Sequence, residues 1–120
     1  MATVGLTLAA SPAQAAGYSG ACGSGYSVID SMSVTNGLAR AYLTYNSSNG
    51  YNCVVTMNNT GSTHFLDAAV EVSGGDWVRD RGNYKSYAGP VYVYAAGKCI
   101  DWGGSADSAT VNLKWNDHCG

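Results

Sequence analysis

Two histidines are the first residues to consider for chemistry, because a nucleophilic triad of Ser or Cys, His and Asp needs a positioned imidazole. His64 lies beside a turn signal, and His118 precedes a cysteine. Both contexts are typical of surface or capping histidines. We therefore expect no enzyme active site. This expectation depends on whether His64 lies near an Asp and a Ser in the folded chain.

Carboxylates are the second candidates. Glu71, Asp76 and Asp80 lie close in sequence, and a pair of them could cleave a glycosidic bond. Arg79 and Arg81 lie beside Asp80, and mixed charge of this kind is typical of a solvated strand face. The stretch 101–107 is rich in Gly, Ser and Asp but lacks the dense oxygen ligands of a calcium loop. We interpret it as a connecting loop and expect no metal and no cofactor.

Tyrosines give the clearest indication of binding. Tyr92 and Tyr94 alternate with valines, so a regular strand places both Tyr on one face and both Val on the other. The Val face suits a core. The Tyr face, with Tyr42 and Tyr87 as candidate additions, could stack on sugar rings or anchor a protein partner. The alternative is that this Tyr patch packs inside a second layer of the fold. For the three tryptophans we expect core or half-buried positions.

Four cysteines, Cys22, Cys53, Cys99 and Cys119, indicate a stapled domain. An even number in a small exported chain predicts two disulfides. We favour Cys22 with Cys53 and Cys99 with Cys119, because each bridge would tie a chain end to a nearby strand. A zinc site is disfavoured, because it would need paired spacings such as C-x₂-C.

Composition excludes several classes of partner. The chain has 120 residues, which predicts one domain. Six Lys and Arg are scattered without two being adjacent, and the net charge is -2. A nucleic-acid binder would carry a basic stripe and an electrostatic membrane binder a basic cluster. Hydrophobic residues make up 46% of the chain, which indicates a packed core rather than disorder.

The first fifteen residues are typical of a secretory signal peptide. An apolar run at 4–10 is followed by Ser11 and Pro12 and then by a small-x-small site, which predicts cleavage between Ala15 and Ala16. No basic residue precedes the run, which a start codon assigned too far downstream would explain. An ordinary N-terminal strand or helix is the alternative. We expect a secreted, extracellular product with one domain at 16–120.

Turn signals recur through the remaining chain at the spacing of an all-β fold. The expected strands are 26–34, 38–46, 51–58, 64–73, 77–87 with a bulge at Gly82, 91–94, 98–102 and 109–115. Asn36-Gly37 is the strongest hairpin signal, and 88–90 leads into the sixth strand. These seven or eight strands fit a small antiparallel sandwich or a barrel. Residues 16–25 are small and Gly-rich, which predicts a flexible N-terminal arm.

Five segments carry a resemblance to a known family. They are ACGSGY at 21–26, YLTYN at 42–46, GYNCVVT at 50–56, SYAGPVYVY at 86–94 and KCIDWGG at 98–104. Through these segments the chain resembles the spore-associated protein A family of filamentous actinomycetes. The resemblance extends over nearly the whole chain after the expected signal peptide. The resemblance implies a small exported protein of the spore or aerial surface, with no established enzymatic activity.

The leading hypothesis is a non-catalytic protein of the spore or cell surface. A second hypothesis is an adaptor or inhibitor-like subunit that docks in a larger secreted assembly, with the N-terminal arm adding to a partner's sheet edge or cleft. A third is a carbohydrate-binding module that uses the Tyr patch. The partner would then be another secreted protein or a surface polysaccharide.

Overall fold

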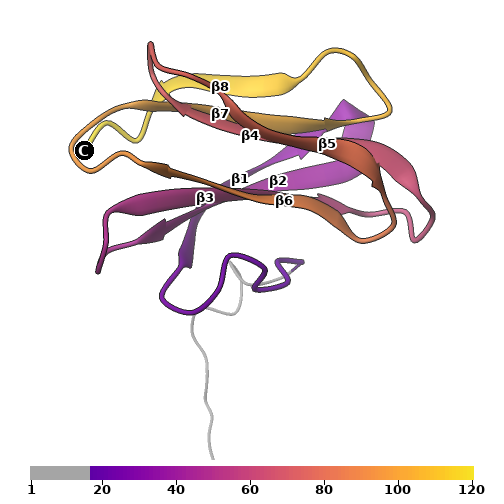
Figure 1. Ribbon diagram of the computed structural model, residues 1–120. Helices are drawn as coiled ribbons and strands as arrows, with labels where there is room; N and C mark the ends of the chain where they lie inside the picture. Colours follow the sequence, from indigo (N-terminus) through magenta and orange to yellow (C-terminus); the bar gives the residue numbers. More distant parts are fainter. Residues whose placement is uncertain (1–16) are drawn as a thin grey trace, which may run out of the picture.

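Two antiparallel sheets pack face to face in the computed structural model, which describes residues 17–120 (Figure 1). The strands are β1 (Ser27–Val34), β2 (Ala39–Asn46), β3 (Tyr51–Asn58), β4 (His64–Val72), β5 (Val78–Tyr84), β6 (Tyr87–Tyr94), β7 (Ile100–Ala106) and β8 (Asn112–Asp117). One sheet has the order β1-β2-β3-β6 and the other β5-β4-β7-β8. The expected all-β fold is confirmed, and it is a sandwich rather than a barrel. The expected signal peptide, residues 1–15, and the first residue of the arm lie outside the described residues.

The core follows from alternation along the central strands. In β4, Leu66, Ala68 and Val70 face the first sheet and are fully or almost fully buried. Trp102 of β7 is also completely buried in this core. Burial of such apolar side chains supplies the main driving force for packing the two sheets. Among residues 17–120, no helix is long and apolar enough to cross a membrane.

The hairpin signals are confirmed where they were clearest. A short 3-10 turn, Thr35–Gly37, joins β1 to β2, and Asn36 and Gly37 both adopt positive φ values. Asn and Gly are the residues that tolerate this left-handed conformation. The second hairpin pairs β2 with β3 without a register shift from Ala39 with Asn58 to Asn46 with Tyr51.

Two expectations about Gly-containing segments were wrong. Gly82 pairs with Leu66 in regular register, so it is no bulge; the ring of Tyr84 lies where a side chain at Gly82 would begin. The bulge instead lies in β6, which starts at Tyr87 rather than Val91. There Gly89, with φ 94° and a cis bond to Pro90, approaches the backbone of β3. An edge strand tolerates proline because its N–H side needs no partner.

The stretch 101–107 was also interpreted wrongly. Residues 101–106 belong to β7, a central strand of the second sheet, and the connecting loop begins only at Asp107. Gly and Asp are weak strand formers, but close packing overrides that preference. A Cβ at Gly103 would overlap the carbonyl oxygen of Asn112, and one at Gly104 would approach Asp67 O to 2.6 Å. Glycine is therefore required at both positions by the neighbouring strands.

Candidate functional site

The outer face of the first sheet carries the predicted Tyr patch. Register places Tyr92 opposite Cys53 and Tyr94 opposite Tyr51, and Tyr87 opposite Met57. Tyr42, opposite Val55, belongs to the same face. The structure therefore brings Tyr42, Tyr87, Tyr92 and Tyr94 together on one face, with the valines of β6 on the core side.

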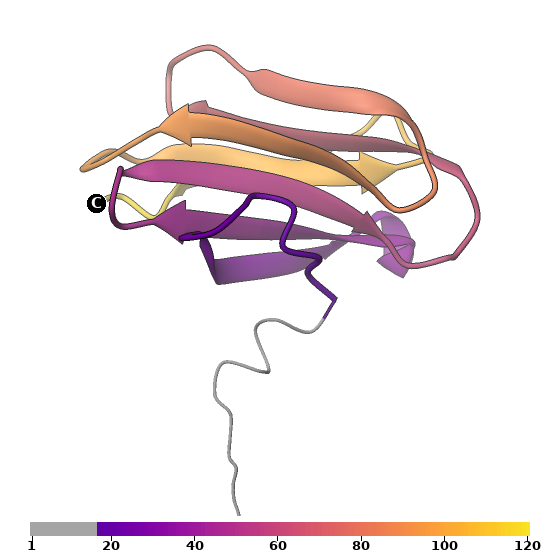
Figure 2. The same cartoon turned by 60° about the horizontal axis from the view of Figure 1, so that its bottom comes forward.

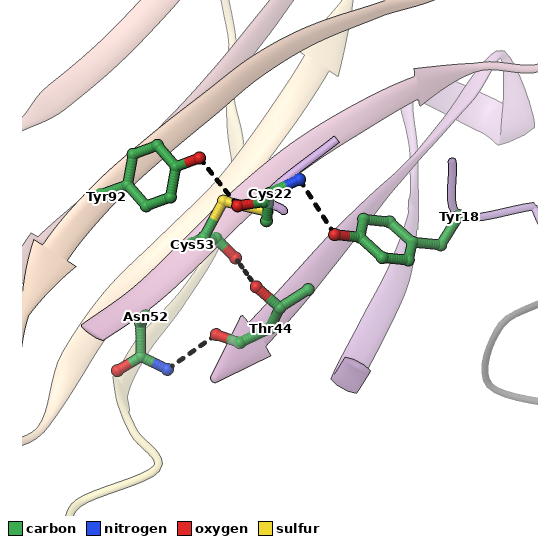
Figure 3. Close-up of a disulfide and its surroundings, with 6 residues drawn as sticks. All are labelled: Tyr18, Cys22, Thr44, Asn52, Cys53 and Tyr92. Atoms are coloured by element: carbon green, nitrogen blue, oxygen red, sulfur yellow. Dashed lines mark hydrogen bonds between the residues drawn. A yellow bond between two sulfur atoms is a disulfide. The ribbon is translucent and has the colours of Figure 1, made fainter. Parts of the chain in front are cut away.

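An N-terminal segment, residues 17–26, lies across this face (Figures 1 and 2). The Cys22–Cys53 disulfide joins it to the middle of β3, with 6.2 Å between the two Cα atoms. Around this bridge, the Tyr92 hydroxyl donates to Cys22 O at 2.9 Å and Cys22 N–H donates to Tyr18 Oη at 3.0 Å (Figure 3). The expected flexible arm is thus tied to the protein's own sheet at Cys22, which is buried.

The exposure of the four tyrosines differs along the face. Tyr42 is buried and contacts the ring of Tyr18, with centroids 5.9 Å apart. Tyr92 contacts Tyr26 edge to face at 5.6 Å, and burial is the main cause that raises its pKa. Tyr94 is 54% exposed. Tyr92 is still 37% exposed, so the open part of the Tyr patch is its Tyr92 and Tyr94 end, while the N-terminal segment packs on Tyr42 and Tyr87.

The second disulfide, Cys99–Cys119, fastens the C-terminal segment beside the turn between β6 and β7. Both expected pairings are confirmed, and no cysteine is free among residues 17–120. A pocket of about 290 Å³ opens next to this bridge. It is lined by Ile29, Tyr45, Asn52, Ala95, Ala96, Gly97, His118, Cys119 and Gly120. The pocket lies where the end of the sandwich meets the chain's last residues.

Three ligand-bearing side chains gather beside this pocket. Ligand atoms of Asp30, Asp117 and His118 lie within 4.8 Å of one another, close enough to share a metal ion. His118 Nε2 is 3.0 Å from Asp30 Oδ2. Lys114 Nζ, however, donates to both oxygens of Asp30, at 3.3 and 3.2 Å. Burial raises the pKa of Asp30, but these hydrogen bonds outweigh it and hold that pKa below its usual value. The lysine supplies the positive charge that a cation would bring.

His64 lies between a serine and an aspartate at the start of β4. Its Nδ1 makes a short hydrogen bond with Asp107 Oδ2, and its Nε2 is 3.3 Å from the hydroxyl of Ser62. Asp107 Oδ1 accepts from Phe65 N–H at 3.0 Å. The His64 hydrogen bond is the main cause that lowers the pKa of Asp107. Ser, His and Asp thus converge in the connectivity of a nucleophilic triad, which the sequence did not predict. Ser62 and Asp107 are exposed, and neither lines the pocket beside the Cys99–Cys119 bridge.

Three buried carboxyl groups, Asp67, Glu71 and Asp101, lie on the outer face of the second sheet. Asp67, 1% exposed, binds both Arg79 and Arg81; Arg81 Nε lies 3.2 Å from Asp67 Oδ2. Glu71 lies opposite Asp101 in the neighbouring strand, and both are buried. The hydrogen bond between them, with burial as a second cause, raises the pKa of Glu71 to about 7.

Glu71, Asp76 and Asp80, considered from the sequence as a catalytic pair but not favoured, have separate partners in the fold. Asp80 accepts from the Tyr84 hydroxyl at 2.6 Å and from Gly89 N–H at 2.8 Å, so it supports the bulge of β6. Asp76 acts on Glu71 only as a nearby negative charge. The paired carboxylates are instead Glu71 and Asp101, which share one hydrogen bond. The expected solvated strand face also proves to be anchored on a buried carboxylate, Asp67.

One comparison with known proteins finds a relative. The chain is 48% identical over 98 residues to "Spore-associated protein A" of Streptomyces coelicolor, a match that covers 80% of this chain and 63% of that protein. The resemblance to spore-associated protein A is confirmed. The chain spans slightly less than two thirds of the length of that relative. No family model matches the chain, and no solved structure matches it.

The three tryptophans differ in their exposure to solvent. In this relative of spore-associated protein A, Trp102 is buried as expected, Trp77 is half-buried, and Trp115 is 60% exposed, which was not expected. Trp115 lies in the edge strand β8, where its ring meets that of Trp77 edge to face at 6.0 Å. Only strand pairing brings these rings together, because 37 intervening residues separate them in the sequence.

Proposed function

We propose that this protein is a non-catalytic component of the extracellular or spore-surface layer. The 48% identity to a spore-associated protein carries the proposal. The two disulfides support it, because such bridges persist in oxidising environments outside the cytosol. They tie the N-terminal segment to β3 and the C-terminal segment to the turn before β7, which suits a small domain exposed to harsh surroundings.

Fractionation of a sporulating culture tests the proposed location. We expect the mature protein in the culture supernatant and on washed spores, with both disulfides intact by non-reducing peptide mapping. A ribosomal protein serves as the control for lysis. A purely cytoplasmic pool with free thiols would contradict the proposal.

The non-catalytic part of the proposal depends on Ser62. Its hydroxyl lies 3.3 Å from His64 Nε2 but also 3.3 Å from Thr60 Oγ1, on an exposed turn. A nucleophilic serine also needs donors for the oxyanion and a site for the substrate. Ser62 does not line the pocket beside the Cys99–Cys119 bridge. We therefore interpret the Ser62–His64–Asp107 chain as a tie between the start of β4 and the loop after β7.

A fluorophosphonate probe, which labels activated serines, tests this interpretation directly. We expect no labelling of the purified protein above that of the Ser62→Ala variant. A trypsin sample serves as the positive control. Labelling that disappears in Ser62→Ala and in His64→Gln would overturn the non-catalytic assignment.

A further inference from the structure

Small residues hollow the outer face of the second sheet. One row across its four strands consists of Arg79, Ala69, Gly103 and Leu113, each directly opposite the next. The two central positions carry a methyl group and a hydrogen atom, while the edge positions carry long side chains. A pocket of about 110 Å³ lies here. Its lining is Ala69, Trp77, Arg79, Val111, Leu113 and Trp115.

Two tryptophans form the walls of this pocket. Trp77 immediately precedes the edge strand β5, and Trp115 belongs to the opposite edge strand β8. Their rings meet at an interplanar angle of 81°, with centroids 6.0 Å apart. The two indoles thus present one ring face and one ring edge at right angles. Trp115 is the most exposed large hydrophobic residue among residues 17–120.

One guanidinium provides polar contacts at the same pocket. Arg79 directs Nε and Nη2 toward the buried carboxylate of Asp67, which fixes the plane of the group. A guanidinium has five N–H donors, so three remain for a ligand. Arg81 also binds Asp67. Asp67 compensates only one of these two arginine charges, so the remaining donors of Arg79 can bind hydroxyl, amide or carboxylate acceptors of a ligand.

These features fit a pyranose ring. A sugar ring has an apolar C–H face that packs on an indole and a rim of hydroxyls that bind planar donors such as arginine. The pocket is well below the about 300–1,000 Å³ of sites that enclose a whole drug-sized ligand. It therefore suits a single ring of a polymer that continues across the surface. A stable protein partner would need about 800 Å² of this face, much of which consists of charged pairs.

We propose that the pocket of Trp77, Arg79 and Trp115 binds one sugar ring of a polysaccharide. This site differs from the Tyr patch on the other sheet. The proposal rests on the proposed surface function for the source of its ligand, which would be a wall or coat glycan. Binding itself is a property of the purified protein.

Retention on insoluble glycans tests the site. The probes are chitin, cellulose and purified peptidoglycan, with competition by soluble N-acetylglucosamine tetramer. We expect retention of the native protein on at least one matrix and an affinity at least tenfold lower for Trp115→Ala. Trp115→Tyr should keep most of the affinity, because a stacking ring remains, and Arg79→Gln should lower it several-fold. Near-ultraviolet circular dichroism confirms that each variant is folded.

Tyr94→Ala is the matched control, because Tyr94 is a similarly exposed aromatic residue on the opposite sheet. It should bind within twofold of the native protein. Absence of retention on all three matrices, or equal affinity of Trp115→Ala, would overturn the proposal. Loss with Tyr94→Ala alone would assign binding to the Tyr patch and equally overturn it. If the protein binds glycans but is absent from spores and from the culture supernatant, the sugar site is supported and the proposed surface function is contradicted.

Discussion

At the scale of single residues, Glu71 and Asp101 form an uncommon pair of carboxyl groups on two central strands. Burial alone would raise the pKa of Asp101, but hydrogen bonds from Glu71, Asn116 N–H and the Ser73 hydroxyl outweigh it and lower that pKa. The same shared hydrogen bond raises the pKa of Glu71 to about 7. One proton therefore stays on Glu71 where an isolated carboxyl group would have lost it.

The raised pKa of Glu71 predicts a pH-dependent stability. Between its ordinary pKa of 4.5 and about 7, the folded state holds a proton that the unfolded state has lost. Stability then falls as pH rises: the contribution of Glu71 is complete below pH about 4.5 and lost as pH rises through about 7. Asp101 acts in the opposite sense only at lower pH.

Urea unfolding at a series of pH values from 5 to about 8 measures this effect. The native protein should lose stability across the range, and Glu71→Gln should remove most of the slope. Asp76→Asn is the control: it removes only the smallest of the causes that raise the pKa of Glu71, so it should keep most of the slope. An unchanged slope in Glu71→Gln would show that another group titrates.

Residue-level chemistry was only partly predictable from sequence. The alternation in β6 correctly placed Tyr92 and Tyr94 on one face, because a period of two fixes which residues share a side. The approach of Ser62 and His64 to Asp107, 43 residues beyond His64, depends on pairing of β4 with β7. No local pattern encodes such a pairing. The exposure of Trp115 likewise follows from the position of β8 at a sheet edge.

At the scale of the elements, a glycine and a threonine set the distance between the two sheets. The Thr56 hydroxyl of β3 donates to Asp67 O of β4 at 2.9 Å, inside the sandwich. Gly104 of β7 lies against this bond: a Cβ there would lie 2.2 Å from Thr56 Oγ1. The bond is a buried polar contact that crosses from one sheet to the other.

Gly104→Ala should therefore destabilise the protein by about 1–3 kcal/mol, the usual cost of an overpacked core. Thr56→Val keeps the shape and removes the donor, which should cost about 1–2 kcal/mol because Asp67 O is left without that partner. Denaturant midpoints measure both effects. A midpoint for Gly104→Ala equal to that of the native protein would show that the sheets separate easily at this point.

Strand boundaries were most predictable where turn chemistry was distinct. The strand at 51–58 was predicted with its observed limits because Gly and Asn residues flank it. β7 was missed in its second half, since Asp101, Gly103 and Gly104 disfavour strands in isolation. Their strand conformation is imposed by β4 and β8 on either side. The sequence also could not distinguish a sandwich from a barrel, because that difference depends on which strands pair with each other.

At the scale of the whole molecule, the disulfides fix the chain at both ends of the described region. Cys22–Cys53 closes a separation of 31 residues and Cys99–Cys119 one of 20 residues. The loop-entropy relation assigns about 3–4 kcal/mol to each. The sequence favoured both pairings among the three that four cysteines allow, but it could not fix them, because the choice depends on which segments lie side by side in the fold.

The double variant Cys22→Ala/Cys53→Ala should lose about 3–4 kcal/mol of unfolding free energy. It should also lose hydrogen-exchange protection at the Cys22 amide, which bonds to the Tyr18 hydroxyl. The variant lacking the Cys99–Cys119 bridge should lose comparable stability but keep that protection. Equal protection of the backbone amide at position 22 in both variants would mean that the tyrosines hold the N-terminal segment without the bridge.

The path of the chain between the sheets has a kinetic consequence. The chain crosses from one sheet to the other after β3, after β5 and after β6. The first sheet therefore remains incomplete until Tyr87–Tyr94 has been synthesised, and the second until Asn112–Asp117. Pairings between such distant segments place folding in the range of milliseconds to seconds. A nascent chain that stops before β6 holds no complete sheet, so folding must await almost the entire polypeptide.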